Sequence, residues 1–190
     1  HSFTRRSSDL IRQIHKEYLM AGSNIISANT FGVNAFKCKN LPYTVDELVT
    51  AGIQLVQEAI QEVRSSSNDG EKQPMYAALD IGSIGKLLKP LGEISFDEAY
   101  KTFQEIIIAG DKAGADLILI ETVSDSYEIK AAVLAAKENS NLPVVVTMIF
   151  DESGKLLTGG DVASVTAMLE GLGVDAVGFN VIVTHELQLV

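Results

Sequence analysis

The sequence has a single cysteine, Cys38, among its 190 residues. One thiol excludes an internal disulfide framework and a cysteine cluster within this chain. Long apolar runs are missing too, because the longest are far too short to span a bilayer, and the opening HSFTRRSSDL has no apolar region of the signal-peptide kind. These absences favour a cytoplasmic protein without a membrane partner.

Positive charge is also in short supply. Only 15 residues are Lys or Arg against 25 Asp or Glu, so the formal net charge is −10 at pH 7. Such a surface repels phosphate backbones, which argues against a nucleic-acid partner. The 46% apolar and 21% charged content is typical of a globular protein, and the length suits one domain spanning residues 1–190.

Five short apolar runs bounded by turn residues predict five β-strands. Their apolar residues occupy consecutive rather than alternating positions, which is typical of parallel strands buried on both faces. The predicted strands are Asn24–Thr30, Met75–Ile81, Leu117–Thr122, Pro143–Phe150 and Asp175–Asn180.

Amphipathic patterns between these runs predict helices. SFDE at the start of the third indicates a capping box, with Ser95 as N-cap and Glu98 three residues on. Three helices stop at a glycine, in AGSN, AGAD and LGVD, shortly before a strand. The polar stretch 64–73 predicts a flexible loop. The predicted helices are Ser8–Ala21, Thr44–Arg64, Ser95–Ala113, Ser124–Ser140 and Asp161–Gly171.

Regular alternation of helix and strand predicts an α/β fold with a parallel sheet. Two architectures fit this order, an open doubly wound sheet and part of a (β/α)8 barrel. A complete barrel typically takes about 250 residues, and five strands are too few to close one. The barrel interpretation therefore implies an incomplete chain.

Polar or glycine-rich residues follow all five predicted strands. In either architecture ligands bind at the carboxyl ends of parallel strands, so the five ends together predict a small-molecule site. The third strand shows the pattern most sharply, because the apolar run Leu117–Ile120 stops at Glu121 and Thr122. The other ends are Asn29–Phe31, Asp80–Lys86, Phe150–Gly154 and Gly178–Asn180.

Other candidates are weaker. DIGSIGK, residues 80–86, matches neither common phosphate-loop spacing, so it does not indicate nucleotide binding. His15 lies on an amphipathic helix, which favours a surface or packing role, and His185 has no evident carboxylate or cysteine partner. Cys38 lies between Lys37 and Lys39, and we expect an exposed or half-buried thiol there rather than a reactive one.

Several of these motifs together resemble a known family. IHKEYLMAGSNIISANTFGVNAFK, DIGSIGK, LILIETVSDSYEIKAAVLAAKE, PVVVTMIFDESGKLLTGGD and LGVDAVGFN resemble, in order, the homocysteine S-methyltransferases. Within that family they are most like the homocysteine-binding domain of the cobalamin-dependent methionine synthases. The resemblance extends from about Leu10 to Asn180.

The resemblance implies a (β/α)8 TIM barrel that transfers a methyl group to the homocysteine thiolate and makes methionine. It implies a zinc ion held by three cysteines, which lowers the thiol pKa. The methyl donor is open among cobalamin, folate-linked chemistry and methylated sulfur or nitrogen compounds, with methylcobalamin favoured. Glu121 would hold the substrate ammonium, while Thr122, Asn29, Thr30 and Asn180 would shape the pocket.

The chain departs from the family pattern where the metal should bind. Val181 stands where the family has a zinc-binding cysteine, and the cysteine pair of the eighth strand is absent, as are the first strand and the last two. We therefore expect about five of eight β/α units, no metal-ligating residue and no activity from this chain alone. Open barrel edges could support a homo-oligomer, and the parent protein could carry further domains.

The alternative is a non-catalytic binding or assembly protein that retains the barrel scaffold without the zinc site. An aspartate–glycine motif upstream and a cysteine pair downstream in the reading frame would favour the enzyme.

Overall fold

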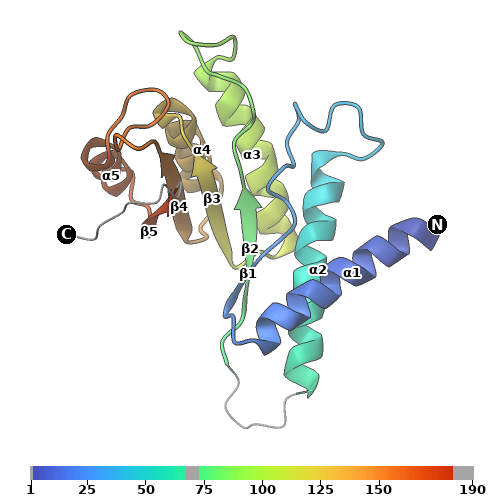
Figure 1. Ribbon diagram of the computed structural model, residues 1–190. Coiled ribbons are helices and arrows are strands. Elements are labelled where there is room, and N and C mark those ends of the chain that lie inside the picture. Colours follow the sequence, from blue (N-terminus) through green and yellow to red (C-terminus); the bar gives the residue numbers. More distant parts are fainter. Residues whose placement is uncertain (1, 67–72, 182–190) are drawn as a thin grey trace.

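The computed structural model describes the backbone of residues 2–66 and 73–181, which alternates strictly between helix and strand (Figure 1). In chain order the elements are α1 (Ser2–Met20), β1 (Ile25–Ser27), α2 (Val45–Ser66), β2 (Tyr76–Ile81), α3 (Phe96–Ala113), β3 (Leu117–Val123), α4 (Ser126–Asn139), β4 (Val144–Phe150), α5 (Val162–Gly171) and β5 (Ala176–Val181). Every helix and strand predicted from the sequence is present.

The five strands form one parallel sheet in the order β1-β2-β3-β4-β5. Each strand therefore pairs with the next strand along the chain. A doubly wound sheet reverses its strand order at a switch point, whereas a barrel adds each strand beside the last. The sequential order is that of a half-barrel, which confirms the barrel interpretation and excludes the doubly wound one.

A short local motif joins three helices to the strands that follow them. Gly22, Gly114 and Gly173 have φ angles of 105°, 86° and 72°, a left-handed backbone that glycine adopts without a steric penalty. Two residues later, an aspartate or asparagine side chain binds the backbone of the neighbouring strand. Asp116 Oδ2 accepts from Ala77 N at 2.7 Å and Asp175 Oδ2 accepts from Val144 N at 2.8 Å.

Asn24 completes this set, since its Nδ2 donates to Pro74 O at 2.6 Å. The motif thus ends a helix and sets the start of a strand against its neighbour within three residues. At the other end of α3 the predicted capping box is confirmed, because Ser95 and Glu98 bind each other's backbone N–H groups.

One face of the sheet packs on the helices and forms the core. Alternate residues of each strand point to it, as expected from the two-residue repeat of a strand. Leu79 shows the contact, because a Cβ added to Gly110 of α3 would lie 2.4 Å from its Cδ2. The buried residues on this face, in the strands or directly after β1, are Ile26, Ala28, Ala77, Leu79, Ile81, Ile118, Ile120, Val144, Val146 and Met148.

The opposite face is the concave side of the half-barrel. Its residues are more exposed and more polar toward the carboxyl ends of the strands. They include Ser27 at the end of β1, Asn29 after it, Asp80, Glu121, Thr147 and Asn180. This face is therefore where the fold presents polar side chains to a ligand.

Three expectations require correction. Strand β1 spans Ile25–Ser27 rather than Asn24–Thr30, because the chain turns early, with Thr30 N donating to Ala28 O at 2.7 Å. Cys38 is buried, not exposed or half-buried, so its thiol packs as a small apolar group. Helix α2 continues to Ser66, which shortens the predicted loop 64–73, whose residues 67–72 lie outside the described part.

No helix in the described ranges 2–66 and 73–181 is long and apolar enough to cross a membrane.

Candidate functional site

The end of β3 is irregular at the two residues singled out from the sequence. Ile120 pairs with Val146 and Val123 with Met148, so Glu121 and Thr122 together oppose Thr147 alone. This is a β-bulge, a device that redirects side chains and is frequent beside active sites. Thr122 has φ 60°, and among the described residues it is the only non-glycine residue with positive φ.

A left-handed backbone at a β-branched residue costs about 1–3 kcal/mol. The bulge turns Thr122 toward the concave face, where its Oγ1 accepts a hydrogen bond from Asn180 Nδ2 at 2.5 Å. Asn180 lies on β5, so this contact crosses β4 and ties two strand ends together. The structure thus brings together two of the five predicted site residues.

Asn29 and Thr30, the two predicted residues after β1, face opposite sides. Thr30 is only 1% exposed and lies on the helix-covered side, where its Cγ2 is close to Gly52 of α2. Its Oγ1 donates to Asp80 O at 2.8 Å and accepts from Asp80 N at 3.2 Å. Thr30 therefore fixes the backbone of Asp80, while Asn29 is exposed on the concave side.

Asp80 is a buried carboxyl group beside this contact, and sequence reasoning did not select it as a site residue. Only 6% of it is exposed, and its Oδ1 has no hydrogen-bond partner within the protein. Burial, and then the negative charge of Glu121, raise the pKa of Asp80 from 3.8 to about 7. Two carboxyl groups at the ends of neighbouring strands are the signal that could have identified it.

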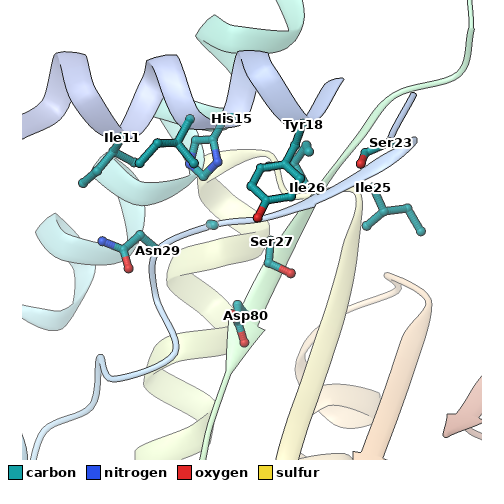
Figure 2. A pocket seen from close by; sticks show the side chains of 11 residues that line it. Ile11, His15, Tyr18, Ser23, Ile25, Ile26, Ser27, Asn29 and Asp80 are labelled. Carbon is teal, nitrogen blue, oxygen red and sulfur yellow. The ribbon is translucent and has the colours of Figure 1, made fainter. Parts of the chain in front are cut away.

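A hollow of about 520 Å³ runs along the free edge of β1 and reaches Asp80 (Figure 2). Helix α1 contributes His15 and Tyr18 to one side, and the strand ends contribute Ser27, Asn29 and Asp80 to the other. The remaining walls are mainly apolar, from Ile11, Ile14, Ile25, Ile26 and Ala28. An apolar hollow with a few polar groups is the usual form of a small-molecule site.

A second polar network holds the glycine-rich loop that follows β2. Glu128, 3% exposed in the first turn of α4, accepts from Ile84 N at 2.6 Å and from Ser83 Oγ at 3.1 Å. Burial raises the pKa of Glu128, and these two hydrogen bonds oppose the rise. Lys37 Nζ donates to Ser83 O at 2.6 Å, so loops after β1 and β2 are joined to α4. The DIGSIGK loop is therefore held in place by hydrogen bonds to Glu128 and Lys37.

Replacing Glu128 with alanine should destabilise the protein by about 1–3 kcal/mol, because it leaves the buried Ile84 N–H without an acceptor. Denaturant unfolding measures the change, and amide exchange should be faster at Ile84 than in the parent protein. Glu105→Ala on α3 is the matched control, because Glu105 is exposed and its loss should cost less than about 0.5 kcal/mol. Equal effects of the two changes would contradict the role of Glu128.

The residues present do not fit the zinc site that the resemblance implies. Within residues 7–66 and 73–180, no three His, Cys, Asp or Glu side chains are grouped to hold a metal ion. Cys38 is buried, and Val181 cannot supply the thiolate expected at its position. His15 is 7% exposed and burial lowers its pKa, which agrees with the packing role expected of it, whereas His185 lies outside the described residues.

The geometry defines a parallel half-barrel protein with an acidic site at its strand ends. A family model of homocysteine S-methyltransferases matches residues 1–189, and the chain belongs to that family. Methionine synthase of Mycobacterium leprae is 26% identical over 181 residues, which are 90% of this chain and 14% of that protein. The methionine synthase of Mycobacterium tuberculosis matches to the same extent.

A crystal structure of the Escherichia coli homocysteine methyltransferase MmuM in its metallated form superposes with a TM-score of 0.81 at 20% identity. The match covers 90% of this chain and 62% of that one. At this identity the likeness shows a shared fold. The chain thus spans about a seventh of the methionine synthases that it matches and under two thirds of MmuM.

Proposed function

We propose that this chain supplies the amino-acid-binding part of a homocysteine S-methyltransferase site. Glu121 takes the ammonium group of homocysteine, and Thr122, Asn29 and Asn180 bound the pocket around it. Thr30 does not line the pocket but positions Asp80, because its hydroxyl group fixes the backbone of that residue.

The observation that carries the proposal is the bulge at Glu121 and Thr122. It places a carboxylate on the concave face of a family barrel at the carboxyl end of a strand, where barrel enzymes bind substrate. Strain at Thr122 persists only where surrounding contacts over-determine it, and the hydrogen bond from Asn180 is such a contact. An ammonium group entering a half-buried site needs a charged partner, and Glu121 is suited to that role.

The chemistry at sulfur lies outside what these residues supply. Homocysteine must react as a thiolate, and none of the described side chains forms a zinc site that would produce one. We therefore assign binding and orientation to this chain, and we expect methyl transfer, from methylcobalamin or another donor, to require residues beyond it. The cytoplasm suits the reduced thiol that such an enzyme acts on.

Replacing Glu121 with glutamine should weaken homocysteine binding roughly 10- to 100-fold. The change keeps the size and one acceptor but removes a charge-assisted hydrogen bond of roughly 1.5–3 kcal/mol, at about 1.4 kcal/mol per tenfold. Ligand-observed NMR titration of the 190-residue chain with L-homocysteine measures the change. The control ligand is 4-mercaptobutanoate, which lacks the amino group and should bind both proteins equally. Equal homocysteine affinity would show that Glu121 is only a solvated strand end.

A further inference from the structure

We propose that Asp80 is a second acidic ligand for the substrate ammonium, and that the Asp80–Glu121 pair releases a proton when the ammonium binds. This inference rests on the proposed function and extends it to a residue and a proton exchange. It starts from a buried carboxyl group that no positive group in the described part of the chain neutralises.

The position of Asp80 is fixed by its backbone. Thr30 binds both its N–H and its carbonyl oxygen, and Asp80 pairs with Leu119, two residues before Glu121 on the adjacent strand. Its side chain points to the concave side, opposite the core-facing Leu79 and Ile81. Its Oδ1 atom is buried without a hydrogen-bond partner, and Asp80 lines the same hollow as Asn29.

Among the side chains that the structure describes, the groups around Asp80 supply no positive charge. Helix α1 faces the hollow with Tyr18 and His15, and burial lowers the pKa of His15, which keeps it neutral at pH 7. The facing side chains at the end of β1 and just after it, Ser27 and Asn29, are uncharged, and the charge that acts on Asp80 from β3 is that of Glu121. With its pKa raised to about 7, Asp80 therefore keeps its proton in mildly acidic solution.

An ammonium group would change this balance. In mildly acidic solution Asp80 of the empty pair holds a proton beside the negative charge of Glu121. When an ammonium binds, the proton leaves to solvent, the pair carries two negative charges, and the ligand brings one positive charge. The net charge of the site stays at −1, so the bound ammonium gains two acceptors while the charge in the low-dielectric site is unchanged. A metal ion fits less well, because no third carboxylate, histidine or cysteine joins the pair within the described residues.

Calorimetric titration with L-homocysteine at pH 6, in two buffers of different ionisation enthalpy, counts the proton directly. We expect release of most of one proton at pH 6 and almost none at pH 8, since a carboxyl group with a pKa of about 7 is mostly protonated at the first pH and ionised at the second. Asp80→Asn should abolish the release at pH 6 and weaken binding roughly tenfold at pH 8. Asp111→Asn, the same change at an exposed position of α3, should alter neither quantity.

The wild-type proton count stands without any variant, so a poorly folded Asp80→Asn protein does not remove the test. Homocysteine binding that depends on Glu121 but releases no proton at pH 6 would overturn this inference alone. Release that persists in Asp80→Asn would also overturn it, because another group would then be the source. Homocysteine affinity that is absent, or equal in Glu121→Gln, would overturn the proposed function and this inference together.

Discussion

Replacing Asp80 with asparagine should make the protein more stable at pH 8 by up to about 4 kcal/mol and leave it almost unchanged near pH 3. The pKa of this carboxyl group rises from 3.8 to about 7 on folding, at 1.36 kcal/mol per pKa unit. Near pH 3 the group is protonated in both the folded and the unfolded chain and costs nothing. Above pH 7 it is ionised in both, and only the folded state bears the cost of a buried charge beside Glu121.

The wild-type free energy of unfolding should therefore fall as pH rises from about 4 to 7, and Asp80→Asn should remove that part of the decline. Urea unfolding at a series of pH values measures both curves. Asp111→Asn, on the exposed side of α3, is the control and should run parallel to the wild type. A constant difference between Asp80→Asn and wild type across this range would mean that Asp80 ionises in the folded protein as it does in water.

A stabilising change at a buried polar position is itself informative. Proteins retain costly groups where function requires them, and stability gained there often lowers activity. Asp80 destabilises the fold at neutral pH, and Thr122 adds a strained backbone at the end of the adjacent strand, in the same site. Both costs fall on the concave face, and neither falls on the helix-covered core.

The helices and the parallel sheet could be predicted from the sequence because their signals are local. Apolar runs, the Ser95–Glu98 capping box and the glycine at three helix ends act over a few residues, and the structure confirms them. Strand β1 was predicted too long for a physical reason. It pairs on one side only, so no second neighbour extends it past Ser27, where the chain turns.

The details of the candidate site depend on contacts between distant residues, which periodicity does not report. The hydrogen bond between Thr122 and Asn180 spans 58 positions, and that between Thr30 and Asp80 spans 50. Nothing local to Glu121 indicates that the strand carries an extra residue there, because the bulge is defined by its register against β4. The polar character of the strand ends was predictable, whereas their pairing was not.

Replacing Phe103 with alanine should destabilise the protein by about 3–5 kcal/mol, the second large effect that we expect. Phe103 lies on the buried face of α3, is 0% exposed, and is among the largest fully buried side chains in the described part of the chain. Alanine removes the apolar surface of the ring and leaves a cavity, because neighbours in a close-packed core relax only partly. The free energy of unfolding, obtained from urea denaturation at constant pH, measures the loss.

Phe179→Ala is the matched control, since it removes the same ring from β5, where Phe179 is 51% exposed. Its edge-to-face contact with Phe150, at 5.7 Å between ring centroids, contributes roughly 0.5–1.5 kcal/mol, so the loss should stay near 1 kcal/mol. Phe179 pairs with the core-facing Met148, so the rings of Phe103 and Phe179 both lie on the helix-covered side of the sheet, and the contrast tests whether that side remains open at β5 in solution. If Phe179→Ala cost as much as Phe103→Ala, the far side of β5 would be covered in solution, and the half-barrel would continue there into an associated strand or subunit.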